Sequence, residues 1–325
     1  MKKILSAAVI VLSLILLASC ATKEQGPTDL VPHAFTDIAT LPNFTVEAGG
    51  KEETVTAVEG CVVLDGYAYV AKIKNKKAGY LYRIDVDTGE KITMVNADTG
   101  SENCIDLYHA NDMAAFEMDG KKYLLVGTLS DMTDRALLVI ELIDAGDGRG
   151  FTQYRIDRKY ATVFSIMYEV KVYGIEVLSV EGHRVYMLIR SGLDFYTGFI
   201  DFDSSLKKAN FTKAFTIRCA DVLIDGNTVS VNLNDYYQQG FTLHDGRLYV
   251  PFTRINSDMP HSIVLVYDYE GEGTARLPVM SETLMFQHPD STKFEIESFS
   301  FYNGKMYFST NCDSPVTDGF HYFEF

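Results

Sequence analysis

The residues of this sequence that could do chemistry are polar side chains placed just before recurring apolar runs. His109 lies three residues before Asp112, and two acids, Glu295 and Glu297, precede a similar run near the C-terminus. A histidine close to carboxylates could act as a general base, so His109 and Asp112 are the candidate catalytic residues. The same spacing is also common by chance, and an ordinary structural role is the alternative.

A wider set of side chains could bind a ligand. Carboxylates and amides bind hard cations such as calcium through oxygen, or hydrogen-bond the hydroxyls of a sugar, and tyrosine rings can stack on a sugar face. The alternative for each residue is that it simply borders a polar, water-filled channel. The candidate ligand-binding residues are Glu59, Asn111, Tyr236, Tyr237, Gln238, Gln239, Glu295 and Glu297.

Established catalytic and cofactor motifs are absent from the sequence. It contains no G-x-S-x-G nucleophile motif, no H-E-x-x-H zinc motif, no paired C-x-x-C and no phosphate-binding glycine loop. The aspartate-rich segments Asp85–Gly89 and Asp144–Gly148 lack the alternating ligands and closing glutamate of an EF-hand, so we interpret them as turns. We expect no cofactor and no metal; a cation such as calcium bound in the central channel is the alternative.

The elements that must position these residues are five copies of one hairpin pattern. Each copy is an apolar run, an acidic residue or asparagine followed by glycine, and a second run that contains a tyrosine. Asp-Gly and Asn-Gly supply the positive φ angles that two-residue hairpins require. The turn glycines are Gly66, Gly120, Gly182, Gly246 and Gly304, and the tyrosines, which we expect in the core, are Tyr69, Tyr123, Tyr186, Tyr249 and Tyr307.

This repeat predicts an all-β, five-bladed β-propeller. The copies recur roughly every 60 residues, and each is followed by one or two further strand-like runs, which is typical of propeller blades. Because the chain ends within the third strand of the last blade, we expect the segment Thr40–Ala48 to supply the missing strand and close the ring. A pair of β-sandwiches is the alternative, but it does not explain the regular return of one hairpin.

The residues before the hairpins resemble those of a known family. His109-Ala-Asn-Asp-Met113, Gln239-Gly240-Phe241 and Glu295-Ile-Glu-Ser-Phe299 are similar to segments of propellers of the helveticin J and teichoic acid biosynthesis protein C type. The first and third repeats, at Glu59-Gly60 and Tyr173-Gly174, lack a matching polar pair. The resemblance implies a propeller that acts at a cell envelope and brings no defined catalytic set.

The N-terminus has the layout of a bacterial lipoprotein signal. Two lysines precede the apolar stretch Ile4–Ala18, and the tetrad Leu17-Ala18-Ser19-Cys20 resembles a lipobox. The stretch is too short to span a bilayer comfortably. We therefore expect a signal peptide at 1–19, lipidation of Cys20, a flexible tether at 20–35 and a single propeller domain at 36–325. An ordinary signal peptide with a chance cysteine is the alternative.

The other cysteines, at 61, 104, 219 and 312, match no zinc or redox spacing. Cys61 lies in an apolar run, which favours a buried free thiol. An oxidising compartment also permits disulfides, and the sequence does not choose among the three possible pairings.

Composition limits the partners. The 325 residues carry a formal charge of -15, and such an acidic surface repels phosphate backbones, so nucleic acid is excluded as a partner. We hypothesise an extracytoplasmic module, anchored to the membrane through its lipid, that binds an envelope glycan, a wall polymer or a protein. The alternative is a polysaccharide hydrolase or lyase at the channel mouth; permanent anchoring argues against a diffusible toxin.

Overall fold

The computed structural model describes residues 29–325, except residues 75, 130–135, 165–170, 207, 219–220, 234–235, 256–259, 270–276 and 314–315. The chain divides into two units, Met1–Leu30 and Val31–Phe325, and the second contains all the strands described below. The expected signal peptide, Cys20 and Cys219 lie outside the described residues.

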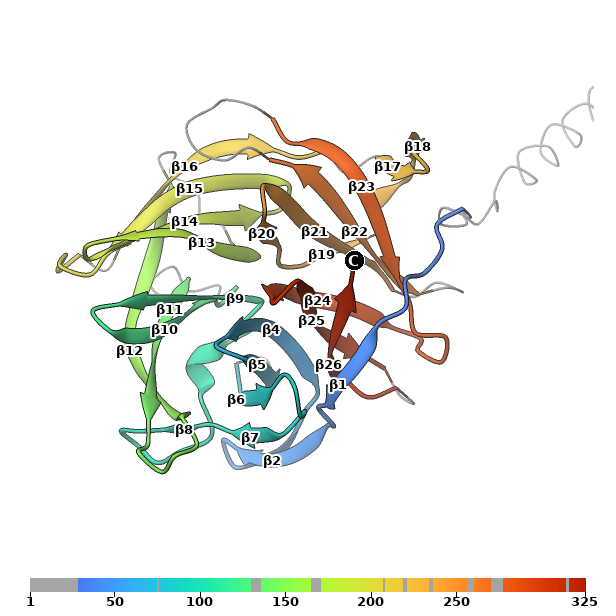
Figure 1. Cartoon of the computed structure of the whole chain (residues 1–325). Helices are drawn as coiled ribbons and strands as arrows, with labels where there is room; N and C mark the ends of the chain where they lie inside the picture. Colours follow the sequence, from blue (N-terminus) through green and yellow to red (C-terminus); the bar gives the residue numbers. More distant parts are fainter. Residues whose placement is uncertain are drawn as a thin grey trace, which may run out of the picture. The chain divides into compact units, whose positions relative to one another are not determined.

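The unit Val31–Phe325 is built from β-strands, with one short 3-10 helix, η1 (Ile105–Leu107), among the described residues. Its strands form five blades around a common centre (Figure 1). The innermost strand of each blade contacts those of the two neighbouring blades, so the first blade meets the second and the fifth. The predicted all-β fold with five propeller blades is confirmed.

The first three blades are antiparallel sheets in chain order. Blade 1 contains β4 (Ala57–Leu64), β5 (Tyr67–Lys74), β6 (Ala78–Asp85) and β7 (Lys91–Thr93). Blade 2 contains β9 (Asp112–Met118), β10 (Lys121–Gly127), β11 (Leu137–Asp144) and β12 (Phe151–Phe164), with β8 (Val95–Asn96) parallel to β12. Blade 3 contains β13 (Gly174–Glu181), β14 (Arg184–Ser191), β15 (Asp194–Asp201) and β16 (Lys208–Thr216). The far end of β12 pairs in parallel with β16 and so connects the sheets of blades 2 and 3.

The last two blades depart from this regular pattern. Blade 4 has its inner strand in two pieces, β19 (Tyr237–Gln238) and β20 (Thr242–His244), both paired with β21 (Arg247–Arg254), and is completed by β22 (His261–Asp268) and β23 (Val279–Phe286). Blade 5 contains β24 (Phe294–Tyr302), β25 (Lys305–Cys312), β26 (Gly319–Glu324) and β1 (Thr36–Thr40). Two hairpins lie outside the blades, namely β2 (Phe44–Ala48) with β3 (Lys51–Val55) and β17 (Asp221–Ile224) with β18 (Asn227–Ser230).

The N-terminal strand of blade 5 is not the segment expected from the sequence. Thr36–Thr40 pairs antiparallel with β26, whereas most of Thr40–Ala48 forms β2 and pairs with β3. Residues 33 and 35, which we had placed in the tether, also contact the propeller: the His33 N–H donates to the Met285 carbonyl oxygen at 2.8 Å, and Phe35 stacks on Phe294.

The hairpin turns explain the one irregular copy of the repeat. In four copies both turn residues have positive φ, as two-residue turns of the Asn-Gly kind require. In the third copy Gly182 is the first turn residue and His183 the second, so the glycine stands one position earlier. The repeat tyrosine is therefore the third residue of the second strand in all five blades. Four of these tyrosines are buried as predicted, whereas Tyr186 is half-buried.

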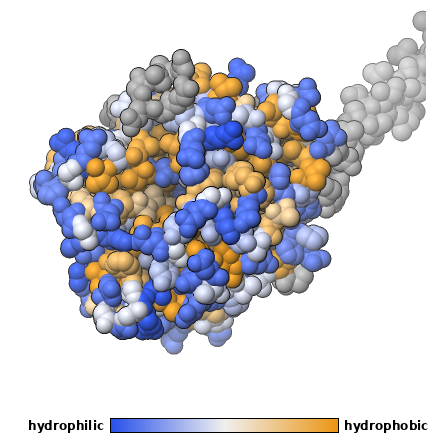
Figure 2. All heavy atoms as spheres, in the orientation of Figure 1, coloured by the Kyte–Doolittle hydropathy of each residue, from blue (hydrophilic) through white to orange (hydrophobic). Residues whose placement is uncertain are grey.

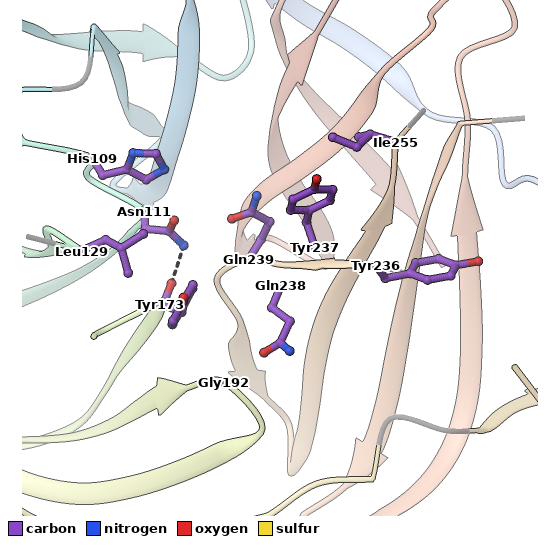
Figure 3. Close-up of a pocket in the computed structure, with 10 residues that line it drawn as sticks. All are labelled: His109, Asn111, Leu129, Tyr173, Gly192, Tyr236, Tyr237, Gln238, Gln239 and Ile255. Atoms are coloured by element: carbon purple, nitrogen blue, oxygen red, sulfur yellow. Dashed lines mark hydrogen bonds between the residues drawn. The ribbon is translucent and has the colours of Figure 1, made fainter. Parts of the chain in front are cut away.

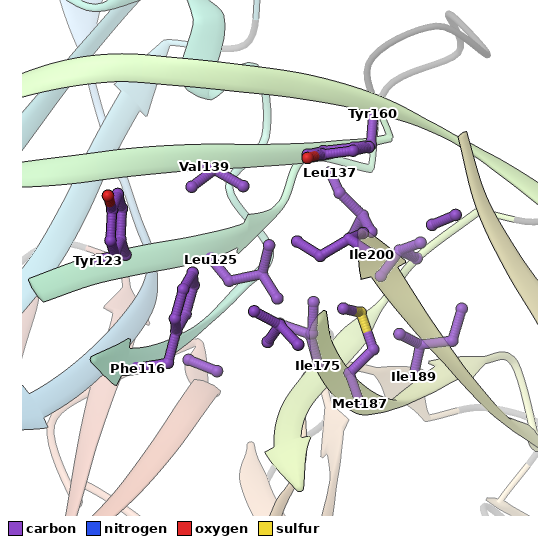
Figure 4. Close-up of a cluster of buried hydrophobic side chains, with 14 of the residues drawn as sticks. Phe116, Tyr123, Leu125, Leu137, Val139, Tyr160, Ile175, Met187, Ile189 and Ile200 are labelled. Carbon is purple, nitrogen blue, oxygen red and sulfur yellow. The ribbon is translucent and has the colours of Figure 1, made fainter. Parts of the chain in front are cut away.

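The hydrophobic core lies between adjacent blades. One cluster of buried side chains comes from blades 2 and 3, where Leu125 and Val139 face Ile175 and Met187 (Figure 4). Other clusters join blades 1 and 2, blades 1 and 5, and blades 4 and 5. Fully burying a side chain such as Ile175 contributes roughly 1.5–3 kcal/mol, so the blade interfaces hold the ring together.

The surface shows hydrophobic residues interspersed among hydrophilic ones on the face drawn in Figure 2. Among the described residues, no helix has the length and apolar character needed to cross a bilayer. The three described cysteines, Cys61, Cys104 and Cys312, are buried free thiols, as expected for Cys61.

Candidate functional site

A pocket of about 710 Å³ opens where the inner strands of blades 2, 3 and 4 begin (Figure 3). Such a volume is in the usual range for small-molecule sites. Its lining residues are His109, Asn111, Leu129, Tyr173, Gly192, Tyr236, Tyr237, Gln238, Gln239 and Ile255. Six of the residues singled out from the sequence, His109, Asn111 and the run Tyr236–Gln239, are thus brought together here.

The two tyrosines of that run differ in role. Tyr236 is buried, and its hydroxyl lies 2.8 Å from Nε2 of His261 in β22. The side chain of Tyr237 is 52% exposed, so its ring is free to contact a ligand. Tyr237 begins the short strand β19, whereas Tyr236 lies just before it.

The amides of the pocket are held in place to different degrees. Asn111 is buried, and its Nδ2 donates to the Tyr173 carbonyl oxygen at 2.7 Å. Gln239 donates through Nε2 to Oε1 of Glu295 at 2.5 Å. The buried Oε1 of Gln238 has no hydrogen-bond partner among the described residues. A buried acceptor of this kind is one that a ligand donor can satisfy.

Asp112 does not line the pocket. Its side chain is buried at the centre of the ring, where Oδ2 accepts the N–H of Ile175 at 2.9 Å and the N–H of Phe241 at 3.2 Å. Its Oδ1 is in hydrogen-bond contact with the Ser298 hydroxyl, which in turn lies 3.0 Å from the Cys61 carbonyl oxygen. Asp112 thereby links all five blades. The structure gives it this role in place of the acid–base role considered from the sequence.

Small residues surround Asp112 at the equivalent place in the other blades. Gly60, Gly174, Gly240 and Ser298 each follow a residue of the candidate set or Tyr173. A Cβ atom at Gly240 would lie 2.6 Å from Cγ of Asp112, and one at Gly60 would lie 2.6 Å from the Ala110 carbonyl oxygen. Only glycine permits such a close approach of the inner strands.

The three acidic candidates, Glu59, Glu295 and Glu297, are buried rather than exposed in the pocket. Glu59 is 2% exposed, and its Oε2, which accepts no hydrogen bond from the described residues, lies 3.6 Å from Nε2 of the pocket residue His109. Glu295 is buried and bound by Gln239 and by Nζ of Lys293 at 2.8 Å. Glu297 is 1% exposed and also has an unpartnered oxygen, Oε2. None of the three lines the pocket directly.

Burial dominates the electrostatics of these groups. It raises the pKa values of Glu59 and Glu297 well above the usual range, and the charge of Glu295 adds to the effect. Burial also lowers the pKa of His109. Both shifts favour the neutral forms, so burial works against an ion pair between Glu59 and His109.

Sequence reasoning missed several residues of the site. Arg190 in β14 is fully buried, and its Nη1 donates to the carbonyl oxygens of Gln239 at 2.6 Å and Gly240 at 3.1 Å, so it holds the break between β19 and β20. Leu129, Gly192 and Ile255 lie in loops that gave no signal in the sequence. Ser298 could have been found, because Glu297-Ser298 occupies the place that Glu59-Gly60 holds in the first repeat.

The described residues contain no group of three or more histidine, cysteine or acidic side chains that could hold a metal ion. The segment Asp85–Gly89 joins β6 to β7, and Oδ1 of Asp85 accepts the N–H groups of Asp87 and Thr88 in the turn. This is the turn that the sequence indicated.

Comparison with known protein families and with curated proteins finds no match. Solved structures do match over most of the chain. They include a glycosyl hydrolase from Bacteroides ovatus (9% identity, TM-score 0.47, 92% of this chain and 93% of that one) and an α-L-arabinofuranosidase from Lactobacillus brevis (9%, 0.46, 82% and 90%). The catalytic domain of a Coprinopsis cinerea GH62 α-L-arabinofuranosidase also matches (10%, 0.43, 90% and 97%). Likenesses of this strength carry no argument about substrate or reaction.

Proposed function

We propose that the pocket of blades 2, 3 and 4 binds a neutral saccharide unit of a cell-envelope polymer. The observation that carries the proposal is the composition of the lining, which combines the exposed ring of Tyr237 with the side-chain amides of Asn111, Gln238 and Gln239. An aromatic face beside amides suits a ring that is apolar on its faces and bears hydroxyls around its edge.

The absence of charge in the lining supports a neutral ligand. No aspartate, glutamate, lysine or arginine occurs among the described residues that line the pocket. A charged sugar would lose its hydration on entering the pocket and would meet no group of opposite charge in the lining. Hydrogen bonds to neutral amides compensate only part of this desolvation cost. The free acceptor of Gln238 further favours a ligand that offers hydroxyl donors.

The envelope context of this proposal comes from the N-terminal sequence. Lipidation at Cys20 would place the propeller on a membrane outside the cytoplasm, where wall and capsule polymers are within reach. The resemblance to helveticin J and teichoic acid biosynthesis protein C-type propellers agrees with an envelope role.

Binding is tested by calorimetry with neutral and charged oligosaccharides from envelope polymers. We expect a neutral oligosaccharide to bind, and Tyr237→Ala to weaken it about tenfold because stacking is lost. Leu206→Ala is the matched control, since Leu206 is 67% exposed and does not line the pocket. Equal affinity of the two variants, or a preference for charged oligosaccharides, would contradict the proposal.

Hydrolysis of a glycosidic bond is a second candidate, favoured by the contact between Glu59 and His109. Burial raises the pKa of Glu59, as the general acid of a glycosidase requires, and Glu59 would act on a leaving-group oxygen through His109, which lines the pocket. The solved propellers named above are glycosidases, but their likeness is too distant to argue for this activity. Release of reducing ends by the wild type and its loss in Glu59→Gln would support hydrolysis; retention of intact oligosaccharide would support binding alone.

A further inference from the structure

A buried amine lies at the junction of the first and last blades, away from the pocket. Lys72 belongs to β5 of blade 1, and its side chain is 0% exposed. Its Nζ lies 2.5 Å from Oδ2 of Asp318, just before β26, and 3.1 Å from Oδ1 of Asn43, between β1 and β2. An amine, an amide and a carboxyl group therefore meet at one point.

The position of the three groups is set by backbone contacts around them. The N–H of Leu41 donates to the Asp318 carbonyl oxygen at 2.7 Å, which holds the segment before Asn43 against Asp318. The N–H of Cys312 donates to Oδ1 of Asp318 at 2.7 Å, so the other carboxyl oxygen is directed at the amine. Leu41 and Val58, the latter paired in register with Lys72, are both buried, which keeps the surroundings apolar.

The apolar surroundings favour neutral forms of the reacting groups. Burial lowers the pKa of Lys72, against the opposing charge of Asp318, and burial raises the pKa of Asp318. A neutral amine is a nucleophile, and a protonated carboxyl can donate a proton. Burial therefore shifts both groups toward the protonation states that attack on an amide requires.

We propose that Lys72 and Asn43 become joined by an intramolecular isopeptide bond, with Asp318 transferring the protons. The lone pair of Nζ attacks Cγ of Asn43, and Asp318 donates its proton to Oδ1. The tetrahedral intermediate then collapses: the bond from Cγ to Nδ2 breaks, and the nitrogen leaves as ammonia with a proton delivered through Asp318. Nζ supplies that proton by way of Asp318, and the hydroxyl proton on Oδ1 returns to Asp318 as the Cγ–Oδ1 double bond re-forms, which restores the carboxyl group. The products are one secondary amide and one ammonia, and no oxidant or co-reactant is needed.

The place of the bond gives it a structural purpose. Asn43 is exposed at the turn that follows β1, so ammonia has a path to solvent. β1 is the outer strand of blade 5, whereas Lys72 lies within blade 1. The bond would hold the N-terminal segment across the seam between the first and last blades.

Peptide mass spectrometry of the purified full chain tests this proposal. We expect a tryptic peptide containing Asn43 to be joined to a peptide ending at Lys74, with uncleaved Lys72 inside it and a total mass lower by one ammonia. Asn43→Ala and Asp318→Asn should abolish the joined peptide. Lys91→Arg is the matched control, because Lys91 Nζ donates to the Thr40 carbonyl oxygen at 2.8 Å nearby and should leave the bond intact.

Three results would overturn the proposal. A wild-type chain that yields only linear peptides cleaved at Lys72 shows that the groups form a buried ion pair. Loss of ammonia with two linear peptides shows a succinimide at Asn43 instead. A joined peptide that has lost water shows a bond from Lys72 to Asp318, with Asn43 uninvolved. Because Asn43 is exposed, Asn43→Ala is expected to fold even if Asp318→Asn does not.

Discussion

The carboxyl group of Asp112 is in hydrogen-bond contact with the Ser298 hydroxyl at the centre of the ring. Burial raises the pKa of Asp112 to about 8, so the group is protonated at neutral pH. Its proton can then be donated to Ser298, which leaves the serine hydroxyl free to donate to the Cys61 carbonyl oxygen at 3.0 Å. One protonated carboxyl thus completes a network that reaches every blade.

Removal of this carboxyl should destabilise the propeller strongly. Asp112→Ala leaves the buried N–H groups of Ile175 and Phe241 without an acceptor, at about 1–3 kcal/mol each. Asp112→Asn keeps an acceptor for these two groups and a donor for Ser298, and loses only the acceptor that Oδ1 offers to the N–H of Met113 at 3.0 Å, so it should cost less. Urea unfolding measures both variants. A similar loss of unfolding free energy in the two variants would show that an amide of the same size cannot replace the carboxyl group in this network.

The same group should make stability depend on pH. The pKa of Asp112 is near 8 in the folded state, and its ordinary value is 3.8. Between these values the folded chain holds a proton that the unfolded chain lacks, so the free energy of unfolding contributed by Asp112 falls as pH rises from about 4 to about 8. Asp112→Asn should lack this component. The free energy of unfolding of the wild type, taken relative to that of Asp112→Asn, should therefore be lower at pH 8 than at pH 5. The same difference at both pH values would contradict this prediction.

Gly240 should not tolerate even an alanine. A Cβ atom there would lie 2.6 Å from Cγ of Asp112, which is closer than real contacts allow. Overpacking of this kind typically costs about 1–3 kcal/mol. We expect thermal unfolding of Gly240→Ala at clearly lower temperature, and little change in Leu206→Ala. An unchanged melting temperature would mean that the inner strands can move apart.

Arg190 should support the pocket without touching the ligand. Arg190→Lys keeps the charge but loses the planar fork that reaches both Gln239 and Gly240. We expect weaker saccharide binding through a displaced Gln239, together with a measurable loss of stability. Calorimetry and urea unfolding measure the two effects. Loss of stability with unchanged affinity would show that the arginine serves packing alone.

The sequence by itself determined the repeating hairpins and therefore the five blades. Turn dipeptides such as Asp65-Gly66 and Asn303-Gly304 impose local φ angles, and the tyrosine three positions into the next strand follows the same local pattern. It also indicated that His109, Asn111 and Gln239 precede inner strands. These properties depend on neighbouring residues, which is why they could be read from the chain.

Only the tertiary structure decided which of the candidate site residues line the pocket and which are buried away from it. Asn111 and Asp112 are adjacent in sequence, yet Asn111 lines the pocket whereas Asp112, the first residue of β9, is buried and links the five blades. The burial of Glu59 depends on neighbours more than two hundred residues away, such as Ser309, whose hydroxyl donates to the Glu59 carbonyl oxygen. The strand that completes blade 5 was likewise decided by pairing with β26 at the far end of the chain. Contacts between distant segments leave no local pattern to read.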